Sequence, residues 1–226
     1  MAGSKGIAAL AAGATAAFLA SMGCAPSHAG RTVGEGVLQA EGSLGGPLVT
    51  NLGTAFPVPN IPMGARYGLT DRIDVASHVN LLPLIMGGFL AWDASLTWGV
   101  VRHDGPEGWN LATGTGLVLF TDFQDGARVS PLIDLAGGYT FEWFTPFAGL
   151  EMAIDLWGGD TVIDPYLGFE IDIGDLVLSF AAIWFHAGYD WYASPVRYVS
   201  GDTNGALGFL LGLKYRWDLS EEVRRD

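Results

Sequence analysis

The sequence predicts an all-β protein, a closed antiparallel up-and-down transmembrane β-barrel of about ten strands. Three observations support this fold class. Segments of about ten alternating residues recur between turn residues, which is the length of a tilted membrane strand. Mean hydropathy is high at +0.31, yet no apolar run after residue 30 reaches the length of a membrane helix. The 33 glycines suit tight turns and crowded barrel interiors better than helices.

The clearest alternation lies near the C-terminus, at residues 205–217. Phe209, Leu211, Leu213, Tyr215 and Trp217 form an apolar face, while the opposite face holds Gly208, Gly212, Lys214 and Arg216, with Leu210 as the exception. Successive side chains of a strand point to opposite sides, so this strand separates an apolar medium from a polar interior. Its terminal Tyr and Trp favour a membrane–water boundary.

This stretch resembles the terminal recognition strand of bacterial outer-membrane β-barrel proteins of the small porin-like class. The resemblance rests on Gly212, Leu213, Tyr215 and Trp217. It implies a location in the bacterial outer membrane of a Gram-negative cell. It further implies insertion by the barrel-assembly machinery, with those four residues as the membrane-insertion signal, and surrounding outer-membrane lipid as a partner.

Nine further strands are expected before it, at 33–42, 63–69, 72–80, 90–100, 110–120, 129–141, about 147–155, 166–173 and 176–185. The first alternates poorly and is followed by a Gly/Pro-rich loop at 45–62, so eight strands is the alternative count. Short turns after the second, sixth and eighth strands, with long connections after the first and ninth, match a barrel with both termini in the periplasm.

The N-terminus predicts an export signal over residues 1–29, with Lys5 before an Ala-rich apolar core. Two processing sites compete. Ser27-His28-Ala29 fits ordinary signal cleavage, whereas the stretch ending at Gly23-Cys24 resembles a lipobox that would make Cys24 a lipidated first residue. The barrel is expected to span residues 30–217, with a periplasmic tail at 218–226.

Charge and cysteine content exclude several functions. A formal net charge of −13 argues against nucleic-acid binding, which needs clustered Lys and Arg. Cys24 is the single cysteine, so no intramolecular disulfide can form. No metal-ligand spacing or phosphate loop appears, so neither a metal nor a cofactor is expected.

Charged residues within the strands should face the lumen, because a mid-bilayer Arg or Lys costs about 2 to 4 kcal/mol. The predicted lumen charges are Glu35, Glu41, Arg66, Arg72, Asp74, Asp93, Asp134, Glu151, Asp155, Glu170, Asp172, Lys214 and Arg216. A salt-bridged plug is one interpretation of this set, since small barrels have narrow interiors. A narrow pore that prefers small cationic solutes is the other.

No catalytic residue is assigned, and the chain is not expected to be an enzyme. Two functional alternatives stay open. One is a rim hydrolase that uses His186 with the nearby acids Asp160, Asp164 and Asp190. The other is a soluble secreted β-barrel that binds an apolar ligand. His78, which lies among charges in mid-strand, is expected to be a hydrogen-bonded lumen residue.

Overall fold

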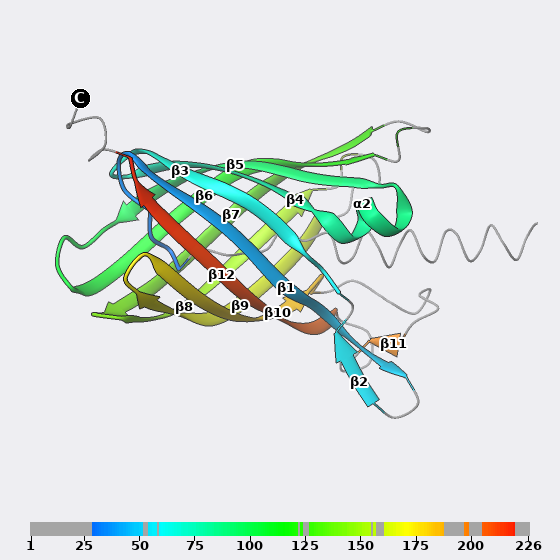
Figure 1. Cartoon of the computed structure of the whole chain (residues 1–226). Coiled ribbons are helices and arrows are strands. Elements are labelled where there is room, and N and C mark those ends of the chain that lie inside the picture. Colours follow the sequence, from blue (N-terminus) through cyan, green and yellow to red (C-terminus); the bar gives the residue numbers. More distant parts are fainter. Residues whose placement is uncertain are drawn as a thin grey trace, which may run out of the picture.

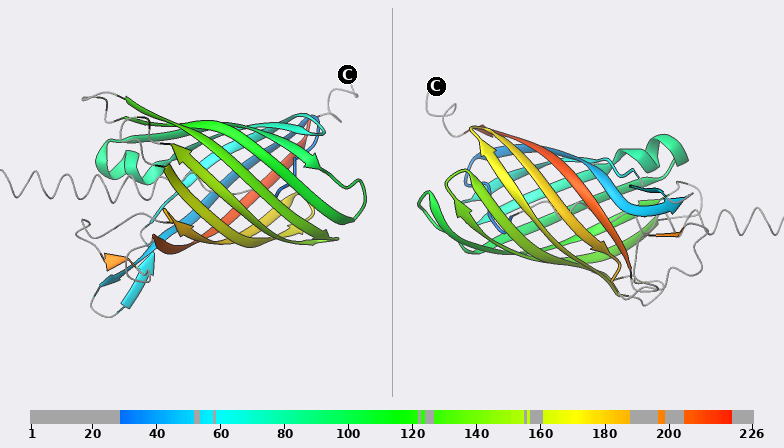
Figure 2. Two further views of the ribbon diagram at one scale, coloured as in Figure 1. Left: turned by 180° about the vertical axis from the view of Figure 1, so that it is seen from behind. Right: turned by 90° about the horizontal axis from the view of Figure 1, so that it is seen from below.

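The computed structural model describes residues 29–51, 54–57, 59–121, 123, 127–154, 156, 161–187, 197–198 and 205–219. Ten long strands coil around a common axis to form a barrel, and each strand is tilted relative to that axis (Figures 1 and 2). The ten strands are β1 (Val37–Asn51), β3 (Pro62–Thr70), β4 (Ile73–Asn80), β5 (Leu90–Val101), β6 (Glu107–Thr121), β7 (Ala127–Phe141), β8 (Phe144–Ile154), β9 (Thr161–Ile173), β10 (Leu176–Phe185) and β12 (Ala206–Asp218).

Neighbouring strands in the sequence pair antiparallel all the way round, and the sheet closes on itself. Strand β1 makes the closure, because it pairs with β12 on one side and with β3 on the other. Leu38, for example, lies opposite Trp217 of β12 and Tyr67 of β3. No strand edge of the barrel is therefore left unpaired over this length, which a structure without water around its backbone requires.

The two ends of the barrel differ. At the terminal end, where β1 begins and β12 ends, turns of two residues join β3 to β4, β7 to β8 and β9 to β10. At the distal end, the far part of β1 extends beyond the barrel wall and pairs with two short strands, β2 (Thr54–Pro57) and β11 (Arg197–Tyr198). The expected short and long connections therefore fall at opposite ends.

The outer surface of the wall is apolar. Exposed large hydrophobic side chains come from all ten strands, and they include Leu44, Tyr67, Val75, Trp98, Leu117, Leu135, Leu150, Leu167, Leu178, Leu211, Leu213, Tyr215 and Trp217. A soluble monomer rarely exposes so much contiguous apolar surface. A hydrophobic exterior around a closed barrel is the arrangement of a transmembrane β-barrel.

Aromatic rings on the outer face support four adjacent strands. Phe144, Phe169, Phe180 and Phe209 lie side by side across β8, β9, β10 and β12, with successive ring centroids 5.6, 5.5 and 5.7 Å apart. Cross-strand aromatic pairs of this kind stabilise a sheet. The alternation that sends these rings outward sends the intervening residues, such as Glu170 and Lys214, into the lumen.

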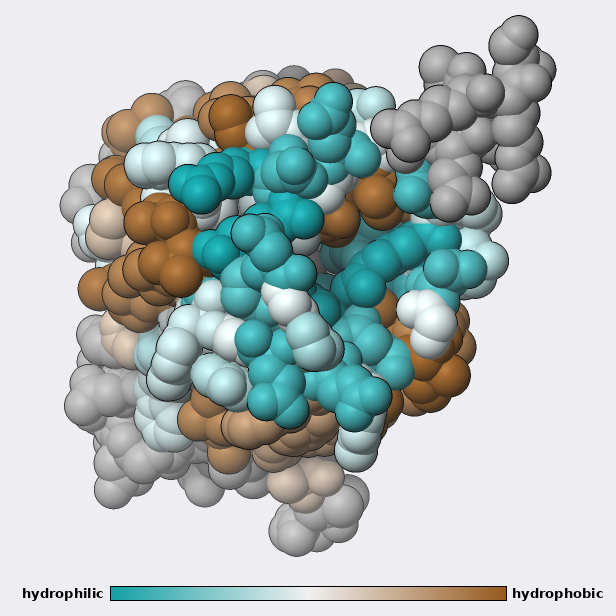
Figure 3. All heavy atoms as spheres, turned by 90° about the vertical axis from the view of Figure 1, so that its left-hand side faces the viewer, coloured by the Kyte–Doolittle hydropathy of each residue, from teal (hydrophilic) through white to brown (hydrophobic). Residues whose placement is uncertain are grey.

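Polar residues gather instead at the centre of the barrel. Figure 3 shows the terminal end, where hydrophilic residues occupy the middle and hydrophobic residues lie at the perimeter. The expected two-sided wall is thus confirmed, and the count is ten strands, not eight. Leu210 also faces inward, where it packs with Ile183 and Phe185 in a buried apolar cluster.

Two details differ from the sequence-based expectation. The first strand begins at Val37, not at residue 33, because residues 29–36 fold into the lumen before the strand starts. The expected loop at 45–62 is partly strand, since β1 continues to Asn51 and β2 pairs with it. Glycine and proline hid that pairing by breaking the alternation.

A short helix, α2 (Leu81–Gly87), follows β4 at the distal end. The Asn80 side chain accepts a hydrogen bond from the Leu82 backbone N–H and so caps its start. Gly88 ends it with φ of 68°, a left-handed conformation that favours glycine. No helix in the described ranges is both long and apolar enough to cross a membrane.

Candidate functional site

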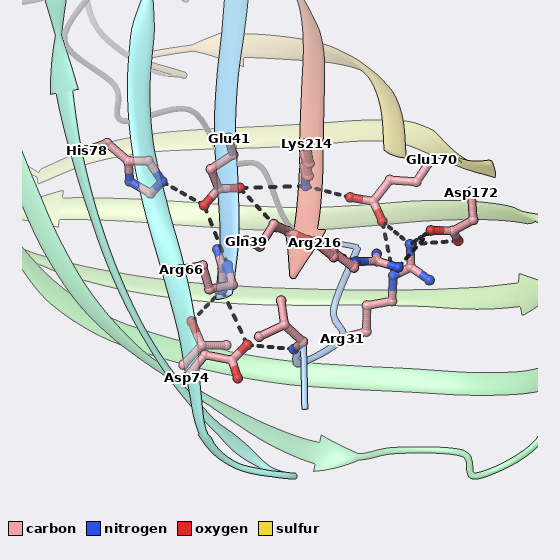
Figure 4. Close-up of polar contacts among 12 residues, drawn as sticks. Arg31, Gln39, Glu41, Arg66, Asp74, His78, Glu170, Asp172, Lys214 and Arg216 are labelled. Atoms are coloured by element: carbon pink, nitrogen blue, oxygen red, sulfur yellow. Dashed lines mark hydrogen bonds and ion pairs between the residues drawn. The ribbon is translucent and has the colours of Figure 1, made fainter. Parts of the chain in front are cut away.

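The candidate site is the lumen, and its centre is a network of ion pairs. Lys214 of β12 lies 2.6 Å from Glu170 of β9 and 3.9 Å from Glu41 of β1. Arg66 of β3 lies 3.6 Å from Glu41 and 3.8 Å from Asp74 of β4. These side chains are all nearly fully buried, so the network links five strands of the barrel across its interior (Figure 4).

Residues 29–36, hereafter the lumenal segment, run from the interior of the barrel to its terminal end, where Glu35 is exposed in the turn before β1. Arg31 binds Glu170 at 2.7 Å and Asp172 at 2.9 Å, and the Val33 backbone N–H donates to Asp74 at 2.9 Å. Arg216 reaches the same Asp172 at 3.0 Å from β12. The segment is therefore a part of the network and fills space that would otherwise be open lumen (Figure 4).

His78 of β4 connects the network to the distal half of the lumen. Its Nε2 lies 2.8 Å from Glu41, and its Nδ1 lies 2.9 Å from Asp93 of β5. An imidazole can donate through both nitrogens only when it is protonated, so this geometry describes a histidinium between two carboxylates. The expectation that His78 is a hydrogen-bonded lumen residue agrees with these contacts.

A row of acids crosses the distal half of the wall. Asp134 of β7 pairs in register with Glu151 of β8, which pairs in turn with Asp164 of β9. Asp134 accepts a hydrogen bond from the Tyr166 hydroxyl at 2.9 Å. Glu151 is only 6% exposed, and the described residues give it no hydrogen bond or ion pair. This half of the lumen is therefore rich in acidic side chains.

His186 lies where β10 ends. Its ring Nδ1 lies 3.1 Å from the Asp164 carboxylate, which also accepts from the His186 backbone N–H at 2.5 Å. The ring is nearly buried, and the residue has a φ of 54°. The two hydrogen bonds to Asp164 explain how this unusual backbone conformation is held. Asp160 and Asp190, the other proposed rim acids, lie outside the described residues.

A salt bridge at the terminal end fastens two turns to the lumenal segment. Arg102 binds the Asp71 carboxylate at 2.9 Å and also reaches the Asp71 carbonyl. The Thr32 hydroxyl donates to that carbonyl at 2.7 Å. The hydrogen bond from Arg102, followed by one from the Glu35 backbone N–H, lowers the pKa of Asp71 below its usual value.

The structure places most of the predicted lumen charges inside the barrel. Glu41, Arg66, Asp74, Asp93, Asp134, Glu151, Glu170, Asp172, Lys214 and Arg216 all face the interior. Two predictions were wrong: Glu35 and Arg72 are exposed in turns, because β1 begins four residues later than expected and β4 one residue later. Asp155 and Cys24 lie outside the described residues. Leu213, Tyr215 and Trp217 face outward on β12, and Gly212 precedes them on the inner face.

Sequence reasoning missed Arg31 and the lumenal segment. Residues 30–36 show no alternation, so the sequence predicts no secondary structure at 30–32 and a strand from residue 33. The one available signal was charge: Arg31 is an isolated cation at the start of a chain whose strand acids outnumber its strand bases. Gln39 was missed as well, and it accepts from Arg216 at 3.1 Å.

Within the described ranges, no group of three or more His, Cys, Asp or Glu side chains could hold a metal ion. A small cavity remains beside the network, lined by Glu41, Ser43, His78, Ser179 and Lys214 among others. A second small cavity, lined by Arg31, Gln39, Glu170 and Arg216 among others, lies between the ion pairs and the lumenal segment.

Comparisons with known proteins give likenesses of architecture. No protein-family model matches the chain, and no curated protein matches it. Among solved structures it is similar to OmpT, an outer membrane protein of Vibrio cholerae, at 10% identity over 80% of this chain and 96% of that one, with a TM-score of 0.35. It is also similar to Ail, the attachment invasion locus protein of Yersinia pestis, at 11% identity over 81% and 99% of the two chains, with a TM-score of 0.30.

A third similar structure is the translocator domain of the autotransporter NalP from Neisseria meningitidis. The identity is 11% over 94% of this chain and 98% of that one, with a TM-score of 0.32. The OmpT and Ail structures, like others found, are outer-membrane proteins. The class that the fold defines is the outer-membrane type of β-barrel.

Proposed function

We propose that the protein is a structural outer-membrane β-barrel whose lumen is closed to ions at rest. One observation carries this proposal. Arg31 folds back into the barrel and pairs with both Glu170 and Asp172, so the lumenal segment and the ion-pair network together obstruct the terminal half. Buried charges held by several partners are costly to separate, which makes spontaneous opening rare.

The acids decide which ions would pass if the segment were displaced. Eight described carboxylates face the lumen, against four Lys or Arg side chains. The carboxylates are Glu41, Asp74, Asp93, Asp134, Glu151, Asp164, Glu170 and Asp172, and the bases are Arg31, Arg66, Lys214 and Arg216. Excess negative charge in a narrow pore attracts cations and repels anions. The narrow cation channel is therefore the opened form of the same barrel.

Planar-bilayer conductance tests the proposal. The wild-type barrel should show no steady current, whereas Arg31→Glu should show current steps whose reversal potential in a KCl gradient favours K⁺. In that variant the new carboxylate repels Glu170 and Asp172 and expels the segment. Arg128→Glu is the matched charge reversal, at an exposed position at the distal end of β7, and should resemble the wild type.

Two results would contradict the proposal. Steady wild-type current would show that the lumen is open, and a silent Arg31→Glu variant that remains folded would show that the segment does not close it.

A rim hydrolase is the second candidate, because the His186–Asp164 pair has the geometry of a base held by an acid. The near burial of the His186 ring favours a structural role over contact with substrate. Esterase or protease turnover that is present in the wild type and lost in His186→Ala would support the hydrolase, while unchanged turnover would remove His186 from that role.

A further inference from the structure

The Ala29–Gly30 peptide bond lies inside the barrel. Ala29 has no exposed surface and packs in the apolar cluster that includes Ala136, Phe147 and Tyr166. Gly30 has a φ of 69°, and a Cβ at this position would lie 2.5 Å from the carbonyl oxygen of Ala136. Only glycine therefore fits against the wall of β7 here.

The same bond is the one that ordinary signal cleavage would cut. Small residues at Ser27 and Ala29 fit a signal-peptidase site, which makes Gly30 the first mature residue. Hydrolysis of this amide by water leaves a carboxylate on Ala29 and an ammonium group on Gly30. Because the folded barrel buries the bond, the cut must come before the barrel closes.

Strand register places acids beside the new ammonium. Ala136 of β7 lies opposite Gly149 of β8, and two residues further along the same face of each strand are Asp134 and Glu151. Two residues of a strand span about 7 Å, so both carboxylates lie near Gly30 on the same face of the wall. The Tyr166 ring lies against Gly149 on this face, and its hydroxyl donates to Asp134. Glu151 is buried without a partner among the described residues, and its charged neighbours Asp134, Asp164 and Asp93 are all acids.

We propose that export processing ends at Ala29 and that the α-ammonium of Gly30 is a buried counter-ion for Asp134 and Glu151. An unpaired buried carboxylate is costly, and a cation held at its side offsets much of that cost. The proposal does not depend on whether the barrel conducts ions.

The lipid-anchored alternative conflicts with this geometry. Cys24 lies five residues before Ala29, a distance of at most about 18 Å when the chain is extended. The distal end of β7 at Ala127 lies nine residues from Ala136, which is about 23 Å along the axis of a barrel with strands tilted near 40°. The opposite route is filled by residues 30–36 and the ion pairs. A lipidated Cys24 would therefore remain inside the polar lumen instead of at the bilayer surface.

Amine acetylation with intact-mass measurement tests the proposal, because this chain has very few amines. Lys5 and Lys214 are the only lysines, so a chain that starts at Gly30 carries the α-amine and Lys214 alone. Lys214 is buried and bound to Glu170. Protein extracted in the folded state should have the mass of an unmodified chain from Gly30, acquire no acetyl group at neutral pH, and acquire two after unfolding.

Other masses or patterns would overturn the proposal. A diacylated chain from Cys24, or any start other than Gly30, would refute the cleavage site. Acetylation of Gly30 in the folded protein at the same rate as in the unfolded protein would show that its α-amine is not buried. The mass of the peptide of residues 30–35 locates the acetyl group at Gly30.

Variants test the counter-ions. In folded Glu151→Gln, Gly30 should be acetylated roughly tenfold faster than in the wild type, as expected for the loss of a charge-assisted hydrogen bond. The double variant Glu151→Gln, Asp134→Asn should be acetylated faster still. Glu35→Gln, the same change at an exposed turn, should leave the rate unchanged. An unaltered rate in folded Glu151→Gln would show that the carboxylate does not hold the ammonium.

Discussion

At the scale of single residues, the lumen depends on side chains that each hold several partners. His78 shows the principle, because Asp93 and Glu41 occupy both of its ring nitrogens. If the imidazolium were removed, the buried carboxylates of Glu41 and Asp93 would both lose their shared hydrogen-bond donor. Removing one member of a buried ion pair is strongly destabilising, since the remaining charge stays buried.

His78→Gln should therefore lower the free energy of unfolding by about 3 kcal/mol. A glutamine amide can donate to one of the two acids but carries no charge. The measurement is the temperature at which the unboiled gel-shifted form of the barrel disappears. His103→Gln, the same substitution in the β5–β6 connection, should change stability by no more than about 0.5 kcal/mol. Equal losses in both variants would contradict the role assigned to His78.

Asp71 makes a pH-dependent contribution at the terminal end. Its hydrogen bond from Arg102 lowers the folded-state pKa, so the stabilisation is fully present above the unfolded pKa of about 3.9. It is lost as the pH falls through the lower folded value. The difference in thermal midpoint between the wild type and Asp71→Asn should persist from pH 7 to 5 and vanish near pH 2. A difference that grows on acidification would contradict this account.

At the scale of elements, the strand faces were predictable and the lumenal segment was not. Strand β12 could be predicted because its Leu213, Tyr215 and Trp217 alternate with Lys214 and Arg216 over a long stretch. The start of β1 was misplaced because Gly34 and Gly36 carry no face preference. The interior position of Arg31 depends on Glu170 and Asp172, which lie about 140 residues away in sequence and give no local signal.

The lumenal segment packs so closely on β3 that one methyl group added to β3 should displace it. A Cβ on Gly68 would lie 1.7 Å from the carbonyl oxygen of Gly34, and the Gly68 carbonyl accepts from the Gly36 N–H at 3.0 Å. Gly68→Ala should therefore push the segment out and make Arg31 accessible to trypsin in the folded barrel. The product is a chain that begins at Thr32, which intact mass detects.

Gly42→Ala is the matched control, because its Cβ would lie 3.7 Å from the Met63 side chain, an ordinary contact. It should leave Arg31 protected, as in the wild type. Cleavage after Arg31 in the wild type itself would show that the segment is not held inside the barrel.

At the scale of the whole molecule, two constraints explain the architecture. Lipid admits only a closed sheet with apolar side chains outside, and a ten-stranded barrel has an interior narrow enough for side chains to fill. The first constraint acts along each strand and could be predicted from alternation. The second concerns which charges meet across the lumen, and this depends on strand count and register, which the sequence constrains only weakly.

A two-sided barrel wall requires that adjacent residues of one strand lie in different media. Leu178 of β10 is exposed on the outer face, while Ser179 lines the small cavity beside Glu41 and Lys214. A mature chain from Gly30 has no native cysteine, so Leu178→Cys and Ser179→Cys can each carry one spin label in lipid bilayers. The label at residue 178 should be relaxed strongly by oxygen, which concentrates in lipid, and the label at 179 weakly. Equal oxygen relaxation at the two positions, in variants that keep the gel shift of the folded barrel, would contradict the two-sided wall.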